Sequence, residues 1–345
     1  TTIPQQQSFY GMPWLASEIG ADGITGPTIA QACATGARCL AAAEQEIHMG
    51  LATNVLVVTA DRTSNGPHLY YPNPAGPGGT GGHEDWVVDS FNHDPNGGHA
   101  MINTAENVAA KHGISLEEQH EVVLLRTEQY RQALADNCAF QRRYMTLPFD
   151  IPNTGYRKTI ATADSDEGVT FSTAEGLAKL RPVLSGGTVT FGSQTHPADG
   201  NAAMIVAATD TARELSRDPG IAIRILGYGQ ARCEKAHMPE ATIPAAKAAL
   251  QQAGLDMKQI DAIKSHNPFA VNDIVFARET GADLARMNNY GCSLIWGHPQ
   301  GPTGLRSIIE LIEELVATGG GIGLFFGCAA GDSSIATVIK VEDRR

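Results

Sequence analysis

The first candidate for chemistry is a cysteine that lies between a short extended run and a helix of small residues. Residues 27–31 predict a strand, and Cys33 comes soon after it, before a helix predicted over Ala37–Met49. The N-terminus of a helix carries partial positive charge and free N–H groups, which favour a thiolate and can receive an oxyanion. Cys33 is therefore a candidate nucleophile. A small buried core cysteine is the commoner role, and Cys39 fits that role.

Three further candidate reactive side chains lie in a rigid turn or directly after a predicted strand. His298 lies between a glycine and a proline, in a turn rigid enough to hold an imidazole in one orientation. Cys328 follows a strand predicted over Ile322–Phe326 and precedes small residues that allow close backbone approach, so it could act as an acid or a base. His266 follows a strand predicted over Ala262–Lys264. A lone loop histidine is usually exposed and inert, but α/β sheets place their sites at strand ends, so these residues together predict one active site.

Two distant segments of the chain share the same order of elements. The first runs from Cys33 through its helix to a strand predicted over Asn54–Thr59. The second runs from the loop 297–304, which contains His298, through a helix predicted over Leu305–Ala317 to the strand described above. This order predicts a duplicated α/β half that puts the cysteine and the histidine at related positions. Any two βαβ units look alike, however, and the pattern alone does not decide between the two interpretations.

The middle of the chain differs from both segments. Residues 66–98 are dense in Pro, Gly, His and Asn and predict a loop. A helix is predicted over Thr104–Lys111, and the capping box Ser115–Glu118 begins a long helix that reaches about Asn137. An insert in an α/β fold is typical of a substrate-covering element, which is the role we assign to residues 66–186.

The remaining elements complete the predicted organisation. Residues 187–190 and 202–207 are expected to return to the sheet, and the C-terminal half begins with a strand near residues 221–223 and a helix over Pro244–Gly254. The predicted division is an incomplete N-terminal half over 1–65, the inserted domain over 66–186, the return of the first half over 187–212, and the C-terminal half over 213–345.

Composition excludes several classes of protein. The 345 residues are 42% apolar and 18% charged, which suits a globular protein, and the net charge of -12 argues against nucleic-acid binding. No apolar run is long enough for a membrane span, and the first residues do not form a signal peptide. The six cysteines form no CxxC pair, so free thiols in a reducing, cytoplasmic location are expected, with no disulfide framework or metal site.

Several segments, taken together, resemble the thiolase family. They resemble its nucleophile motif, its loop-domain stretch, its return to the sheet, its Gly-His-Pro block and its second catalytic cysteine. These matches occur in family order from about Ile24 to the C-terminus, at residues 33–36, 104–109, 113–119, 180–190, 199–200, 297–304 and Cys328.

This resemblance implies a fold and an organisation. The expected fold is thiolase-like α/β, with two duplicated α/β halves in a layered α-β-α-β-α core and an inserted loop domain. Thiolases begin with a strand-helix-strand unit of about 30 residues or more. Because the nucleophile comes early in this chain, that unit is expected to be missing. A homodimer or homotetramer is expected, with no nucleic-acid or membrane partner.

The resemblance also implies an activity and a role for each reactive residue. The reaction is acyl transfer on coenzyme A (CoA) thioesters, in which a 3-ketoacyl-CoA is made by Claisen condensation or cleaved by thiolysis, without a permanently bound cofactor. Cys33 takes the acyl group. His298 activates Cys33 and, with a water held by His266, stabilises the enolate oxygen. Cys328 moves the proton at the reacting carbon, and the N–H groups of Cys33 and Ala330 form an oxyanion hole.

The predicted substrate contacts divide into a polar and an apolar set. Between residues 126 and 158 six basic side chains oppose three acids, so we expect Arg142, Arg143 or Arg157 to approach the CoA phosphates. Thr195 falls where thiolases place a serine that faces the pantetheine arm.

The apolar set concerns the acyl chain. Met101 matches a thiolase residue that lines the acyl pocket, and Phe269 is a further predicted substrate-binding residue. Trp296 replaces a smaller residue of the family, so it either narrows this pocket or belongs to the core.

Departures from the family pattern keep competing functions open. Residues 266–269 are His-Asn-Pro-Phe where thiolases usually have Asn-Glu-Ala-Phe, and the glycine-rich string after Cys328 is reduced to residues 329–332. A decarboxylating ketoacyl synthase could use Cys33, His266 and His298, although it needs no second cysteine. A non-catalytic thiolase-like subunit is a further competing function, and a papain-like Cys-His hydrolase is a more distant one.

Overall fold

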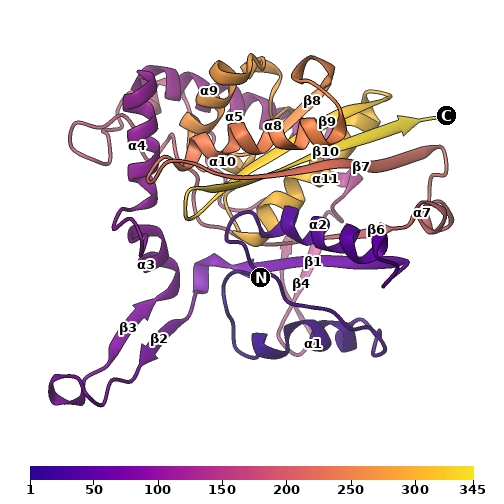
Figure 1. The fold of residues 1–345 in the computed structure, drawn as a ribbon, viewed down its shortest axis with the longest axis horizontal. Coiled ribbons are helices and arrows are strands. Elements are labelled where there is room, and N and C mark those ends of the chain that lie inside the picture. The colour runs from indigo at the N-terminus through magenta and orange to yellow at the C-terminus, as the bar shows by residue number, and fades with distance from the viewer.

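The larger of the two main sheets lies in the C-terminal part of the chain. The computed structural model describes residues 1–345 and is shown in Figure 1. The strand order is β7-β10-β9-β8, with β8 and β9 parallel and the other neighbours antiparallel. In the two central strands, β9 and β10, consecutive residues are buried, so side chains on both faces of the sheet are shielded from water. This is expected for a sheet that is covered on both faces. The four strands span β7 (Ile221–Arg232), β8 (Ala262–His266), β9 (Gly320–Ala329) and β10 (Ser333–Asp343).

The second sheet consists of two strands that are far apart in sequence. β1 (Asn54–Arg62) pairs antiparallel with β6 (Asp199–Ala207) along its full length. The chain between these strands therefore leaves the sheet and returns to it, as an insert must. The predicted domain boundaries after residues 65, 186 and 212 stay a prediction.

Two helices form the layer between the sheets. α2 (Thr35–His48) packs against α11 (Gly301–Ala317), and each contacts both sheets. The two backbones approach closely at Gly36, where a Cβ atom would lie 2.5 Å from the backbone nitrogen of Leu305. A residue without a side chain is required there. Because Cys33 precedes α2 and His298 precedes α11, this helix contact brings the two residues together.

The related order of elements in the two halves is present. α2, β1 and β6 correspond to α11, β9 and β10, since each half has a helix followed by an antiparallel strand pair. In the C-terminal half α8 (Thr242–Ala253) and α9 (Ala270–Thr280) cover the other face of the sheet. The N-terminal half has no counterpart of β7, α8, β8 and α9, and the outward side chains Leu56 and Ile205 of its sheet are exposed.

The insert covers one end of the layered core. α4 (Met101–His112) and α5 (Leu116–Cys138) pack on α9. An arm made of β2 (His68–Tyr71) and β3 (Gly82–Asp85) projects from the body and joins α4 through α3 (Figure 1). The remaining elements are α1 (Gly11–Glu18), α3 (Trp86–Asn92), β4 (Phe149–Pro152), β5 (Thr159–Ala163), α6 (Ala174–Leu177), α7 (Thr209–Leu215) and α10 (Ser293–Trp296).

Most predicted helices and strands are confirmed, with bounds that shift by a few residues, but three segments differ. Residues 27–31 form no strand, because only an isolated bridge between Gln31 and Cys33 pairs their backbone. Residues 66–98 are not all loop, since they hold β2, β3 and α3; the Asp85 carboxylate caps α3 by accepting two backbone N–H groups. Residues 187–190 contribute only one bridge, between Pro182 and Thr190.

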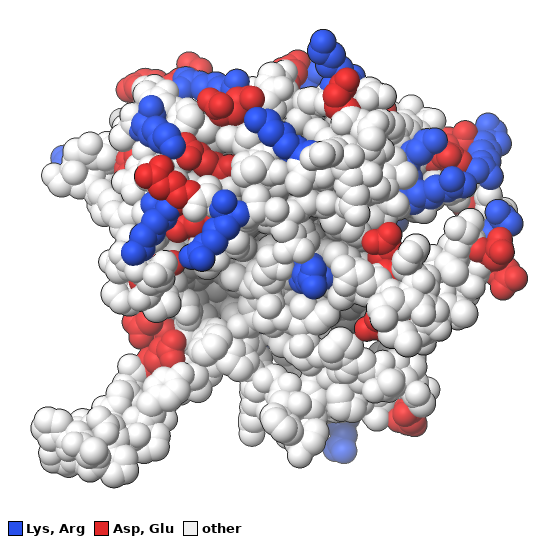
Figure 2. All heavy atoms as spheres, viewed as in Figure 1, with Lys and Arg blue, Asp and Glu red and all other residues white.

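Charged side chains are unevenly distributed over the surface. Acidic and basic groups are interspersed over the upper part of the face in Figure 2, whereas the tip of the β2–β3 arm is free of charged residues on that face. None of the helices combines the length and the apolar character that crossing a membrane requires.

Candidate active site

The turn before α2 is built to present Cys33. The Thr35 hydroxyl donates to the carbonyl of Ala32 at 2.8 Å and accepts the backbone N–H of Gln31 at 2.8 Å. Ala32 has a φ of 43°, an uncommon value for a residue with a side chain. The hydroxyl therefore closes a tight turn that aims the cysteine away from the helix and into a cavity.

His298 is held against this cysteine from the other half of the molecule. Its Nε2 lies 3.1 Å from Cys33 Sγ, and its Nδ1 lies 2.7 Å from Thr303 Oγ1. The backbone N–H of His298 donates to the carbonyl of His196 at 2.8 Å. With Nδ1–H donating to Thr303, the lone pair of Nε2 faces the thiol and can take its proton.

Burial favours the neutral forms of both groups, which opposes the expected preference of Cys33 for the thiolate. Burial raises the pKa of the Cys33 thiol to about 12, and hydrogen bonds from the backbone N–H groups of Ala330 and Cys33 only partly oppose this. Burial also lowers the pKa of His298 to about 3. Desolvation thus outweighs the helix N-terminus, so proton transfer must accompany the attack of the sulfur. The same two N–H groups lie beside the Cys33 sulfur, so they are close to the place where the thioester oxygen would become negative as the sulfur attacks.

Cys328 lies at the end of β9, on the wall of the same cavity. Its Sγ accepts a hydrogen bond from Asn272 Nδ2 at 3.3 Å. Burial raises the pKa of Cys328 well above its usual value, and the amide of Asn272 acts in the opposite direction. A thiol with a raised pKa and one donor is a strong base once it is deprotonated.

His266 stacks on His298, with ring centroids 4.1 Å apart. Its Nδ1 lies 2.9 Å from Ser293 Oγ, and its buried Nε2 has no hydrogen-bond partner. Burial and the neighbouring His298 lower the pKa of His266 well below its usual value. A neutral ring with one free buried nitrogen can hold a water at the reaction centre.

The cysteine and the two histidines also form a set of residue types that can bind a metal. The ligand atoms of Cys33, His266 and His298 lie within 4.8 Å of one another. At 3.1 Å, however, the sulfur and His298 Nε2 are at hydrogen-bond distance. A metal bound at about 2.3 Å from sulfur and about 2.0 Å from nitrogen in tetrahedral geometry would separate them further. The geometry therefore fits a proton-transfer pair.

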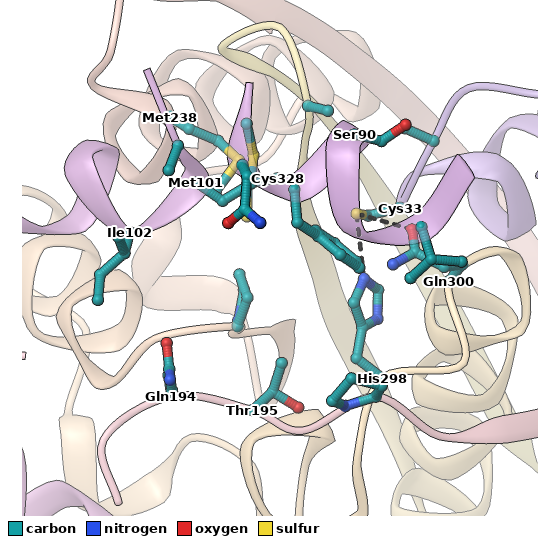
Figure 3. A pocket seen from close by; sticks show the side chains of 18 of the residues that line it. Cys33, Ser90, Met101, Ile102, Gln194, Thr195, Met238, His298, Gln300 and Cys328 are labelled. Carbon is teal, nitrogen blue, oxygen red and sulfur yellow. Dashed lines mark hydrogen bonds between the residues drawn. The ribbon is translucent and has the colours of Figure 1, made fainter. Parts of the chain in front are cut away.

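Cys33, His298 and Cys328 line one cavity of about 680 Å³ whose lining is mostly apolar, and His266 stacks on His298 without belonging to that lining. Figure 3 shows Cys33, His298 and Gln300 on one side of it, with Met101, Met238 and Cys328 across from them. The predicted Met101, Phe269 and Thr195 all line it, as does Ala330. The Thr195 hydroxyl donates to the carbonyl of Ser293 at 2.5 Å, which fixes its position.

Other predicted residues lie away from the cavity lining. The guanidinium of Arg142 donates to the carbonyls of Asn137 and Leu147, and that of Arg143 pairs with Glu313 at 2.7 Å. The side chain of Arg157 has no hydrogen-bond partner in the chain.

The structure supports the core interpretation of Trp296. The residue is 3% exposed and packs in the main hydrophobic cluster. The guanidinium carbon of Arg306 lies over its ring, 4.1 Å from the ring centroid. It does not belong to the lining of the cavity.

Sequence reasoning missed four polar residues of the site: Gln300, Thr303, Asn272 and Ser293. Gln300 and Thr303 lie in the block 297–304, so their closeness to His298 in the sequence could have indicated that they belong to the site. Asn272 and Ser293 had no such signal, because only the fold brings them to Cys328 and His266.

Two family models together match almost the whole chain. The profile described as "Thiolase, N-terminal domain" matches residues 13–210, and the one described as "Thiolase, C-terminal domain" matches residues 220–341. The chain belongs to the thiolase family. An acetyl-CoA acetyltransferase of Chromobacterium violaceum is 32% identical over 323 residues, which cover 91% of this chain and 79% of that protein. The mitochondrial 3-ketoacyl-CoA thiolase of Homo sapiens is 32% identical over 241 residues, which cover 70% of this chain and 59% of that protein.

Solved thiolase structures share the fold. The crystal structure of human mitochondrial 3-ketoacyl-CoA thiolase matches with a TM-score of 0.89 and 28% identity, over 99% of this chain and 85% of that one. A second crystal structure of that enzyme, in complex with CoA, matches with the same TM-score and identity over 99% of this chain and 84% of that one. The thiolase-like α/β fold is thereby confirmed, and these relatives are acyltransferases. Neither a decarboxylating ketoacyl synthase nor a non-catalytic subunit is favoured.

Proposed function

We propose that this thiolase-family protein makes or cleaves the carbon–carbon bond of a 3-ketoacyl-CoA through an acyl-Cys33 intermediate. The observation that carries the proposal is the contact of 3.1 Å between Cys33 Sγ and His298 Nε2, on a cavity that Cys328 also lines. A nucleophile with its base, and a second thiol on the same cavity, are the groups that two successive steps of acyl transfer require.

In the first half-reaction Cys33 takes the acyl group. His298 Nε2 accepts the thiol proton while the sulfur attacks the thioester carbon, and the bond from that carbon to the CoA sulfur breaks. The leaving CoA thiolate takes a proton from Cys328. The step ends with acyl-Cys33, an imidazolium at His298 and a thiolate at Cys328, and the N–H groups of Cys33 and Ala330 hold the oxyanion.

In the second half-reaction Cys328 removes a proton from the α-carbon of another acyl-CoA. The enolate oxygen is stabilised by Nε2–H of His298 and by a water on the free nitrogen of His266. The carbanion attacks the acyl carbon, the bond to Cys33 breaks, and His298 returns its proton to the Cys33 sulfur. Every group is then back in its starting state, and the steps run in reverse for cleavage.

The cavity supports a division of the substrate into two parts. Met101 and Phe269 offer apolar contacts for the acyl chain, and Thr195 marks the side along which the pantetheine arm lies. Arg142, Arg143 and Arg157 were the candidates for contact with the CoA phosphates. We select Arg157, because it alone of the three has a guanidinium without a partner in the chain.

We also propose a homodimer or homotetramer that works in the cytoplasm on lipid-derived thioesters. Exposed aromatic residues on the projecting arm, Tyr70 and Tyr71, support self-association. Six free cysteines support a reducing compartment. Light scattering on the purified protein tests the first point, and a fluorescent fusion tests the second.

The central test is mass spectrometry of the intact protein after mixing with acetyl-CoA. We expect one acetyl group, located on the peptide that contains Cys33, and its absence in Cys33→Ala. Cys138→Ala is the matched control and should acylate normally. An acetyl group found on another cysteine would contradict the proposal. Consumption of malonyl-CoA with release of carbon dioxide would support the ketoacyl synthase instead.

A further inference from the structure

Gln300 lies against the side of the Cys33 thiol that His298 leaves free. Its Oε1 is 3.5 Å from Cys33 Sγ, and both contacts of the sulfur are drawn in Figure 3. The residue is 7% exposed, and its buried Nε2 has no hydrogen-bond partner. A buried amide nitrogen without a partner is costly, so a further role for this group is expected.

The backbone of Gln300 is strained. Its φ of 59° and ψ of -110° lie in a region that residues with a side chain rarely adopt. The neighbouring Gly301 N–H donates to the Asp61 carboxylate at 2.9 Å, and the Gln300 carbonyl accepts the N–H of Thr303 at 3.1 Å, so the strained turn is fixed from both sides. A glycine would fit this backbone without strain. The presence of a long amide side chain therefore needs a reason other than local folding.

The chemistry of the neighbouring sulfur supplies that reason. The thiol has one proton, which it can donate to Gln300 Oε1 or to His298 Nε2. When the proton moves to His298, the sulfur becomes negative and needs donors. Rotation of the amide by a half turn about its last side-chain bond replaces Oε1 with Nε2–H, which donates to the thiolate. Hydrogen bonds to charged groups are roughly twice as strong as those between neutral groups.

We propose that Gln300 is a further catalytic group, whose amide donates to the Cys33 sulfur whenever that sulfur carries negative charge. This occurs during acylation and again when Cys33 leaves the acyl carbon. The inference rests on the proposed role of Cys33 as nucleophile. In both steps the amide oxygen and nitrogen exchange places, and no covalent bond of Gln300 changes.

The test uses the rate at which iodoacetamide alkylates Cys33, measured on its peptide by mass spectrometry between pH 6 and pH 10. Gln300→Leu keeps the bulk and loses the donor, so we expect alkylation near neutral pH to slow about 10- to 100-fold. kcat should fall to a similar extent while KM changes little. Gln300→Glu should slow alkylation further, because a carboxylate repels the thiolate.

Gln300→Gly separates the chemical role from the structural one. It relieves the strained backbone, so its unfolding temperature should equal or exceed that of the wild type, while alkylation slows as in Gln300→Leu. Gln251→Leu, on the exposed end of α8, is the matched control and should change neither quantity. Wild-type alkylation profiles in both Gln300→Leu and Gln300→Gly would overturn the proposal. Alkylation does not depend on CoA, so a wild type that never acylates would refute the proposed function alone.

Discussion

His266 and His298 lie ring on ring, with an angle of 25° between their planes, although they come from the ends of different elements. His266 ends β8, and His298 precedes α11. Neither imidazole contacts a carboxylate directly, and burial holds the pKa of His298 at about 3 and that of His266 well below its usual value. Two buried rings that are held in the neutral form make the folded protein sensitive to acid.

This stack predicts how stability depends on pH. A histidine with a folded-state pKa below its unfolded value of about 6.5 binds more protons in the unfolded chain. The free energy of unfolding should therefore fall as the pH drops below 6.5, and for His298 the loss should continue to about pH 3. For that residue alone the loss between pH 7.5 and pH 5 is about 2 kcal/mol. Urea unfolding at the two pH values measures it.

His298→Asn is the variant that isolates this contribution. It removes the titrating group, so its loss of stability between the same two pH values should be smaller by about 2 kcal/mol. His48→Asn, at the end of α2 on the surface, serves as the control and should retain the wild-type dependence. An unchanged dependence in His298→Asn would show that other groups cause the acid sensitivity.

Cys328→Ala should separate the two half-reactions. The variant keeps Cys33 and His298, so it should still acylate at Cys33 with acetyl-CoA. It lacks the base for the α-carbon, so exchange of the α-protons of acetyl-CoA for deuterium should fall by at least about 100-fold. Nuclear magnetic resonance of the recovered acetyl-CoA measures the exchange. Cys138→Ala is the control, and retained exchange in Cys328→Ala would contradict the assigned role.

The sequence was sufficient to predict which candidate residues lie close together, but not how burial shifts their pKa values. Cys33, His298, Cys328 and His266 are predicted from their local sequence and from a family resemblance. The first three line one cavity, and His266 stacks on His298. Burial raises the pKa of Cys33 and so opposes the expected thiolate, and the degree of burial depends on elements that pack from the other half of the chain. Residue types near a helix end cannot reveal that desolvation.

The same reasoning explains which structural predictions failed. Long helices such as α5 were predictable because their capping residues are local in sequence. Residues 27–31 have the composition of a strand, but a strand also needs a neighbouring strand, and these residues form only an isolated bridge between Gln31 and Cys33. The Asn272 contact to Cys328 joins residues on different elements, so no local pattern could predict it.

Gly36 allows the backbones of α2 and α11, which position Cys33 and His298, to approach closely. A Cβ atom at Gly36 would lie 2.5 Å from the Leu305 nitrogen and 2.9 Å from the Gly301 carbonyl oxygen. Gly36→Ala should therefore lower the free energy of unfolding by about 1–3 kcal/mol, although alanine normally favours a helix. Acylation of Cys33 should slow as well, since α11 must move. Gly23→Ala meets no neighbouring atom and is the control. Equal or higher stability of Gly36→Ala would refute the close approach.

An acidic protein needs local positive charge to hold the negative phosphates of CoA, because its net charge of -12 repels the ligand. Arg157 is the proposed contact whose guanidinium has no partner, whereas Arg143 is paired with Glu313. Arg157→Ala should raise KM for CoA thioesters about 5- to 20-fold with little change in kcat, because the phosphates are remote from the reacting carbon. Steady-state kinetics with acetyl-CoA measure both constants.

Two comparisons distinguish phosphate recognition from a general defect. The rise in KM should shrink as salt is added, since screening weakens the attraction, and it should vanish with a pantetheine thioester that lacks the nucleotide. Arg143→Ala is the matched variant: loss of its ion pair should leave KM near the wild-type value and reduce stability by less than about 1 kcal/mol. Equal increases of KM for CoA and pantetheine substrates in Arg157→Ala would show that this arginine supports the loop and does not contact the phosphates.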